Sequence, residues 1–231
     1  MRCLCLLAWL GLAFPCGAAE RYCREMHQWI QALSKDSNAV EITAWSGITL
    51  DLRYATSNNM AGQNLYCSEH RAFLHKVAAY KLQRALVLLA NEFPGYRLRI
   101  WDASRPVFAQ EALRAKVRGT PLSPYVSSPG KGSLHNFGMA LDLTVQKPDG
   151  SLMDMGSDFD ELSSKASAQA SIEDSLMQRG ELSITQINNR QGLRRLMQKA
   201  GLTQLPSEWW HFNAASSDSV RTFMKMFGQT N

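Results

Sequence analysis

The chain has 231 residues, of which 45% are hydrophobic and 19% are charged. This is an ordinary globular composition, and the length suits one well-packed domain better than two. The formal net charge is +5, but lysine and arginine form no clustered stripe, so the sequence does not indicate a nucleic-acid-binding protein.

The N-terminal segment differs in composition from the rest of the chain. Residues 1–19 contain a single charge, then an unbroken apolar stretch, then small residues. Such a stretch is too short to span a bilayer and is typical of a secretory signal peptide. We expect cleavage after Ala19, a domain over residues 20–231, no membrane span, and secretion across the inner membrane into the periplasm. A buried N-terminal helix or a lipoprotein anchor at Cys16 are the alternatives.

Cleavage there leaves two cysteines, Cys23 and Cys67. In an oxidising compartment they could form one disulfide that ties the N-terminal segment to the core. Two free, partly buried thiols are the alternative. The spacing does not favour a thiolate metal site.

The first half of the domain begins with an amphipathic pattern that predicts a helix over residues 21–35. Residues 41–56 read as extended, and residues 57–66 as a turn-rich loop. Apolar residues at helical spacing predict a helix over 68–93, with Ser68 as its N-cap.

The middle of the chain is richer in strand patterns. We expect a strand over 96–104, a helix over 106–119 that opens with a proline, and a Pro/Ser/Gly-rich loop over 119–133. A strand over 137–145 follows, and an Asp-Gly turn predicts that residues 151–155 pair back as a hairpin.

The last third begins with an irregular acidic segment, residues 154–167. We then expect a helix over 188–201, an extended segment over 202–213 and a final helix over 217–228. The hairpin-like connections favour an α+β fold, a single domain whose central, mainly antiparallel sheet is flanked by helices, over alternating βαβ units.

The predicted strand over 137–145 places an acidic residue, Asp142, among apolar neighbours. Strand alternation puts Ala140, Asp142 and Thr144 on one face, toward a cleft, and the neighbours between them in the core. A buried carboxylate is costly without a partner. His135 lies just before the strand, and together the two side chains can form two ligands of a metal site.

A second short segment, EWWHFN, offers the third ligand, His211. Two histidines and a carboxylate that leave one position open for water are typical of a hydrolytic zinc site. Glu208 precedes His211 by three residues, close enough to act as general base on that water without binding the metal.

These residues carry a family resemblance. The pattern SxHxxGxAxD is matched at every fixed position, and ExWH is matched as well, by Ser133, His135, Gly138, Ala140, Asp142, Glu208, Trp210 and His211. Together they resemble the zinc D,D-peptidases of peptidoglycan metabolism. Segments 51–66, 104–106 and 154–161 are similar to the D-alanyl-D-alanine dipeptidases of the VanX type, and the resemblance covers nearly all of residues 45–213.

The resemblance implies a zinc cleft with one Zn²⁺ per chain and a small D,D-dipeptide as substrate, hydrolysed to two D-alanines. The implied roles are zinc binding by His135, Asp142 and His211, general-base catalysis by Glu208, oxyanion stabilisation by Arg105, and substrate contact by Ser133 and Tyr54. A fixed guanidinium beside a tetrahedral intermediate independently suits Arg105, which lies where a strand passes into a helix.

Two other functions remain open. One is a D,D-carboxypeptidase or endopeptidase that acts on the peptidoglycan peptides themselves. The other is a zinc-containing binding domain without turnover, which the presence of both Glu208 and Arg105 disfavours. The sequence departs from the family pattern in the residues DAS, which directly precede Arg105. This difference concerns the shape of the pocket rather than the metal ligands. The sequence does not indicate an oligomeric state.

Several other polar and aromatic residues have simpler interpretations. His27, His70 and His75 are expected to face solvent, because they have no partners at ligand spacing. One of Trp209 and Trp210 is expected in the core and the other near the site. The acidic residues of the 154–161 segment include two, Asp160 and Glu161, that could bind the free amine of a dipeptide or equally belong to a solvated acidic loop. Asp158 is expected in such a loop.

Overall fold

The computed structural model describes residues 16–127 and 131–228. Most of the predicted signal peptide, residues 1–15, lies outside this range. The helices are α1 (Cys16–Leu33), α2 (Lys76–Glu92), α3 (Val107–Val117), α4 (Ala170–Gln178), α5 (Ile184–Lys199) and α6 (Ser217–Phe223). The strands are β1 (Ala39–Glu41), β2 (Ile48–Leu50), β3 (Phe73–His75), β4 (Arg97–Asp102), β5 (Ala140–Gln146), β6 (Thr203–Leu205) and β7 (Glu208–Asn213).

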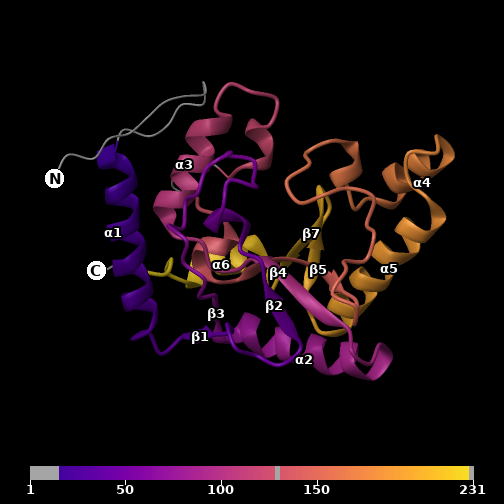
Figure 1. Cartoon of the computed structure of the whole chain (residues 1–231), viewed down its shortest axis with the longest axis horizontal. Helices are drawn as coiled ribbons and strands as arrows, with labels where there is room; N and C mark the ends of the chain where they lie inside the picture. Colours follow the sequence, from indigo (N-terminus) through magenta and orange to yellow (C-terminus); the bar gives the residue numbers. More distant parts are fainter. Residues whose placement is uncertain (1–15, 128–130, 229–231) are drawn as a thin grey trace.

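The main sheet has the strand order β2-β4-β5-β7-β6. The β2–β4 pair is parallel, and the other three pairs are antiparallel. A separate two-stranded sheet joins β1 and β3. The prediction of an α+β fold with a mainly antiparallel sheet is therefore confirmed (Figure 1).

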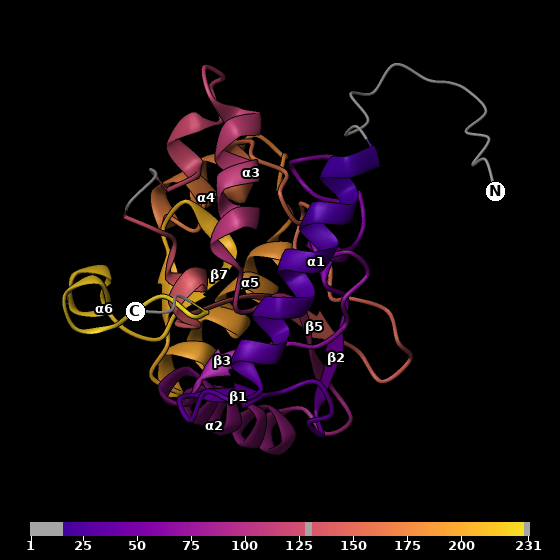
Figure 2. The ribbon, with the colours of Figure 1, turned by 90° about the vertical axis from the view of Figure 1, so that its left-hand side faces the viewer.

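Helices surround this sheet on several sides. Helices α2 and α5 contact each other and strands of the main sheet. Figure 1 places α1 at one side of the molecule and α4 and α5 at the opposite side, and Figure 2 shows α1 running across the face turned to the viewer. Within the described residues, none of the helices combines the length and the apolar character needed to cross a membrane.

Strand β5 occupies the centre of the main sheet, and all seven of its residues are buried. The prediction of a core face and a cleft face is therefore only half right. Ala140 and Thr144, which share the face of Asp142, are as buried as Leu141 and Leu143. The physical reason is that a central strand covered on both sides has no solvent face.

The helix predicted over 68–93 begins later than expected. Residues 73–75 form β3 and pair with β1, and α2 starts only at Lys76. The N-cap is His75, whose Nδ1 accepts a hydrogen bond from the Val77 N–H at 3.2 Å, so Ser68 is not the cap. His75 is half-buried, which corrects the expectation that it faces solvent, whereas His27 and His70 are exposed as expected.

The C-terminal half has a helix that the pattern did not predict, α4. Helix α5 also begins before the predicted residue 188, because Ser183 and Gln186 form a capping box at its start. The hairpin after β5 is confirmed by a bridge between Gln146 and Leu152.

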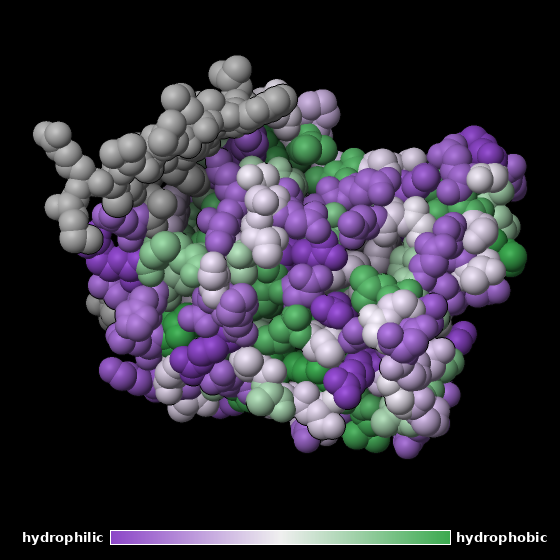
Figure 3. Space-filling view, viewed as in Figure 1, coloured by the Kyte–Doolittle hydropathy of each residue, from purple (hydrophilic) through white to green (hydrophobic). Residues whose placement is uncertain are grey.

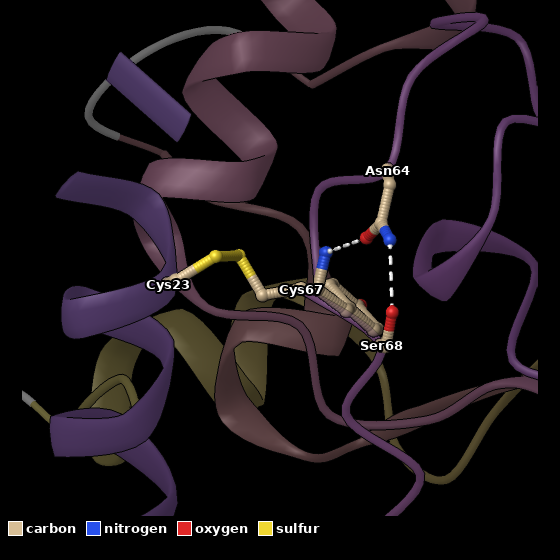
Figure 4. Close-up of a disulfide and its surroundings, with 5 residues drawn as sticks. Cys23, Asn64, Cys67 and Ser68 are labelled. Atoms are coloured by element: carbon tan, nitrogen blue, oxygen red, sulfur yellow. Dashed lines mark hydrogen bonds between the residues drawn. A yellow bond between two sulfur atoms is a disulfide. The ribbon is translucent and has the colours of Figure 1, made fainter. Parts of the chain in front are cut away.

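Cys23 and Cys67 form a disulfide that links α1 to the segment before β3 (Figure 4). Cys67 and Ser68 both have left-handed backbone conformations, with φ of 51° and 60°. The Asn64 side chain supports this turn by accepting a hydrogen bond from the Tyr66 N–H at 3.1 Å. On the face seen in Figure 3, hydrophobic residues are scattered among hydrophilic ones, as is usual for protein surfaces.

Candidate active site

A short 3-10 helix, Leu134–Phe137, presents His135 to the interior. Ser133 and Asn136 form a capping box at its start, and Gly138 ends it with φ of 64°. A Cβ on Gly138 would lie 2.4 Å from the Phe227 ring, so this position requires glycine for packing as well as for conformation. The motif glycine therefore fixes the turn that carries His135 into β5.

His135, Asp142 and His211 converge from three places in the chain. Asp142 and His211 are directly opposite each other in the β5–β7 pair. His211 Nδ1 lies 2.9 Å from Asp142 Oδ1 and 3.2 Å from His135 Nε2, and His135 Nε2 lies 3.4 Å from Asp142 Oδ2. All three side chains are buried.

In each histidine, one ring nitrogen points away from the point where the three side chains meet, and its hydrogen-bond partner determines which nitrogen faces that point. His135 Nδ1 lies 2.7 Å from the Ala103 carbonyl oxygen, so this nitrogen donates and leaves Nε2 as the inward lone pair. His211 Nε2 lies 2.8 Å from Asn213 Oδ1, which leaves Nδ1 facing inward in the same way. Such outer partners orient the histidines of metal sites.

These donors fit a zinc ion. Two lone pairs and a carboxylate facing one another repel unless a cation or protons lie between them. Ligands bound to zinc at about 2.0–2.1 Å lie about 3.4 Å apart in a tetrahedral site, close to the separations seen here. When protons rather than a metal lie between these groups, burial opposes ionisation of Asp142, but the protonated histidines His135 and His211 outweigh it and hold the pKa of this carboxyl well below its usual range. The three residues together could hold a metal ion.

Glu208 lies beside the triad at the start of β7. Its Oε2 is 3.9 Å from His211 Nδ1, and its carboxylate lines the same cavity as the triad. Burial raises the pKa of Glu208 to about 7, although His211 favours the ionised form. A carboxylate with a pKa near neutrality can both accept and return a proton.

Arg105 follows β4 and is held in a fixed orientation. Its Nε and Nη2 both donate to the same oxygen, Asp102 Oδ2, at 2.9 and 2.7 Å, and its Nη1 donates to Gln110 Oε1 at 2.8 Å. It lies over the Tyr54 ring, 4.6 Å from the centroid, and 3.6 Å from Asp142 Oδ2. A buried charge held this way is pre-organised for electrostatic stabilisation.

Asp160 forms the wall contributed by the 154–167 segment. Its Oδ2 accepts hydrogen bonds from the Met60 N–H at 2.9 Å and from the Tyr54 hydroxyl at 3.2 Å. Burial raises the pKa of Asp160 to about 7, against the stabilising effect of the Met60 hydrogen bond. Asp160 thereby connects the 57–66 loop, Tyr54 and the cavity.

The cavity between these elements has a volume of about 200 Å³. The seven residues to which the resemblance assigned a role all line it, namely Tyr54, Arg105, Ser133, His135, Asp142, Glu208 and His211. Of the two acidic candidates for binding the substrate amine, Asp160 lines the cavity and Glu161 does not. Ser133 is half-buried, and its hydroxyl also caps the helix that carries His135.

Sequence reasoning missed the residues that support this site. Asp102, Gln110 and Asn213 orient the functional side chains, and no motif pointed to them. Trp209 and Trp210 are both in the core and neither lines the cavity, so the expectation that one lies near the site is wrong. Their side chains instead pack with aromatic neighbours, including each other at 5.5 Å between ring centroids.

Two histidines and an aspartate around one point, with a free glutamate beside them, are typical of metal-dependent hydrolases. Comparison with known proteins narrows this class. The family model described as D-ala-D-ala dipeptidase matches residues 40–227. The chain is 32% identical over 180 residues to the D-alanyl-D-alanine dipeptidase of Escherichia coli (strain K12), covering 78% of this chain and 86% of that protein.

A second relative, the D-alanyl-D-alanine dipeptidase of Enterococcus faecium, is 31% identical over 185 residues, which cover 72% of this chain and 85% of that protein. The chain therefore belongs to the D-Ala-D-Ala dipeptidase family of peptidases.

Proposed function

We propose that this protein is a zinc-dependent dipeptidase that hydrolyses D-Ala-D-Ala to two D-alanines. The observation that carries the proposal is the convergence of His135, Asp142 and His211 next to the carboxylate of Glu208 in one small cavity. The relatives named D-alanyl-D-alanine dipeptidase support the choice of substrate.

Zinc bound by the triad would supply a Lewis acid that polarises the scissile carbonyl and acidifies a water molecule. Glu208 is the proton carrier in this proposal. Its carboxylate accepts a proton from the attacking water and then delivers that proton to the leaving amine. The same side chain can serve both steps because it lines the cavity without being needed as a ligand.

Arg105 stabilises the negative charge that develops on the carbonyl oxygen. Its guanidinium is held by Asp102 and Gln110, so it needs no reorganisation when charge appears. Tyr54 packs against one face of the guanidinium and prevents it from swinging away.

The cavity also suits a short substrate with a free amine. Its volume of about 200 Å³ is smaller than the roughly 300–1,000 Å³ of pockets for drug-sized ligands. Asp160, desolvated and oriented by Met60 and Tyr54, is placed to pair with the substrate ammonium. A peptide extended at its amino end would have to displace this wall, which favours a dipeptide over the peptidoglycan peptides.

The test of the mechanism is the substitution Glu208→Gln in the zinc-loaded protein. We expect kcat for D-Ala-D-Ala to fall at least about 100-fold, as general acid–base catalysis contributes about 10²–10⁴. Zinc content, measured by atomic emission, should stay at one ion per chain. The matched control is Glu181→Gln, an exposed glutamate, which should leave kcat unchanged. Full turnover by the Glu208→Gln enzyme would overturn the mechanism.

The alternative functions are separated by a substrate panel. D,D-, L,D- and L,L-dipeptides and a pentapeptide ending in D-Ala-D-Ala are each incubated with and without a chelator. Turnover of the D,D-dipeptide that the chelator abolishes supports the proposal. Preference for the pentapeptide would indicate a carboxypeptidase, and binding without turnover a non-catalytic zinc domain.

We further propose that the protein acts in the periplasm after removal of residues 1–19. The disulfide between Cys23 and Cys67 supports an oxidising compartment. Fractionation of expressing cells, with mass determination of the mature chain, tests both the location and the cleavage after Ala19.

A further inference from the structure

The cavity lining includes a second arginine, Arg221, whose charge the mechanism above does not use. Arg105 is neutralised by Asp102 and stands close to Asp142. Arg221 is different, because its two hydrogen bonds go to backbone carbonyl oxygens. Its Nε donates to Lys131 and its Nη2 to Gly132, both at 3.1 Å.

These two bonds fix the place of the guanidinium without neutralising it. Lys131 and Gly132 directly precede Ser133, which lines the cavity beside His135. Among residues 16–127 and 131–228, the remaining N–H groups of Arg221 have no hydrogen-bond partner. A planar guanidinium matches a carboxylate in shape and charge.

The helix that carries Arg221 is itself anchored. Ser216 caps α6, and Val220, the residue before Arg221, is buried. After α6, the Phe227 N–H donates to the Asn136 carbonyl oxygen at 2.8 Å. Helix α6 is thus tied to the 3-10 helix of His135, and Arg221 keeps a defined position relative to the triad.

A dipeptide at neutral pH is a zwitterion, with an ammonium at one end and a carboxylate at the other. The cavity wall offers a carboxylate, Asp160, for the first and leaves the second without an assigned partner. We propose that Arg221 binds the C-terminal carboxylate of the substrate and selects for a free carboxyl end. This inference rests on the proposed dipeptidase function and adds a specificity-determining residue to it.

The experiment compares D-Ala-D-Ala with D-Ala-D-alaninamide, which lacks only the terminal negative charge. In the zinc-loaded wild-type enzyme, we expect KM for the amide to be about 10- to 100-fold higher, the usual range for one hydrogen bond to a charged group. Arg221→Gln should raise KM for the acid by the same factor and leave KM for the amide unchanged. Arg221→Lys should restore part of the difference.

The matched control is Arg195→Gln, which removes the same charge from an exposed site on α5 and should change neither KM. A second measurement is the dependence of KM on ionic strength. KM of the wild type for the acid should rise with ionic strength more steeply than KM of Arg221→Gln, because salt screens the charge of Arg221. Unchanged melting temperatures show that the variants fold.

The outcomes separate the two proposals. If the zinc-loaded wild type cleaves neither compound, the proposed function fails and Arg221 has no carboxylate to select. If the wild type cleaves both with equal KM, or if Arg221→Gln raises both KM values equally, the dipeptidase function stands and the role of Arg221 is overturned.

Discussion

Asn213 shows how a residue outside the motifs controls a ligand inside them. Its Oδ1 lies 2.8 Å from His211 Nε2, and this contact turns the Nδ1 lone pair toward His135 and Asp142. The contact arises because Asn213 lies two residues after His211 on the same face of β7. The metal affinity of the site should therefore depend on a side chain that is not itself a ligand.

We predict that Asn213→Ala lowers zinc affinity about 10- to 100-fold, the usual effect of removing a group that orients a metal-binding histidine. The measurement is competition with a chromophoric chelator. Asn91→Ala, at an exposed position of α2, is the control and should bind zinc like the wild type. An unchanged affinity in Asn213→Ala would show that packing alone orients His211.

At the residue scale, the sequence predicted the residues of the two motifs and missed the residues that orient them. His135, Asp142, Glu208 and His211 lie in two short segments whose spacing carries information. Asn213 and Asp102 have no such signal, because an asparagine or aspartate at a strand end has many ordinary uses. Only the tertiary contacts reveal which of them orient the site.

At the scale of elements, one buried side chain from α5 makes several of the contacts that anchor the 154–167 segment. Arg190 is fully buried, and its guanidinium donates to the carbonyl oxygens of Met155 at 2.6 Å, Lys165 at 2.8 Å and Ser167 at 3.3 Å. The segment between these anchors contains Asp160, which lines the cavity. Helix α5 thereby holds one wall of the site in place.

We predict that Arg190→Met lowers the free energy of unfolding by about 2–4 kcal/mol, because it leaves buried carbonyls without donors. It should also raise KM for D-Ala-D-Ala, since Asp160 loses its support, with a smaller change in kcat. Urea denaturation and steady-state kinetics test both effects. Arg195→Met, an exposed arginine of the same helix, should stay within about 0.5 kcal/mol of the wild type.

An Arg190→Met enzyme with normal stability and KM would mean that the 154–167 segment is held by its other contacts. One of these is the hydrogen bond from Trp209 Nε1 to Ser157 Oγ, 2.8 Å long. The sequence pattern could not predict this anchoring. An arginine within an amphipathic helix normally faces solvent, and the acidic segment has no periodicity that would reveal its partner.

The errors at the element scale have a common cause. Residues 73–75 continue a helical pattern but form β3, because β1 supplies hydrogen-bond partners from a distant part of the chain. The seven residues of β5 alternate as a half-exposed strand would, yet both faces are covered. Local patterns predicted which elements exist, and long-range pairing decided their ends and their burial.

At the scale of the whole molecule, the disulfide joins the first helix to the loop that leads toward the site. Cys67 follows Tyr66, whose hydroxyl donates to Asp102 Oδ1 at 2.8 Å, and Asp102 in turn holds Arg105. The backbone of this loop is also fixed by the Tyr66 N–H, which donates to the Tyr54 carbonyl oxygen at 2.9 Å. The sequence left the pairing of the two cysteines open, and only their positions in the fold decide it.

We predict that the double substitution Cys23→Ser with Cys67→Ser destabilises the protein without disabling the site. The sequence separation is 44 residues, and closing a loop of this size stabilises a folded protein by about 2–4 kcal/mol, mainly by restricting the unfolded chain. For a chain of this length, that loss lowers the melting temperature by about 4–16 °C. Because backbone hydrogen bonds still hold Tyr66, kcat at 25 °C should remain within about twofold.

Calorimetry and steady-state kinetics on the same preparations test this prediction, and reduction of the wild type should give the same shift in melting temperature as the double substitution. A large loss of kcat with little change in melting temperature would contradict it, since the bridge would then act on Tyr66, Asp102 and Arg105 in the folded state. The expected result would instead show that the disulfide and the hydrogen bonding of Tyr66 have separate effects. The disulfide limits the freedom of the unfolded chain, and the hydrogen bond from Tyr66 to Asp102 keeps Arg105 in position.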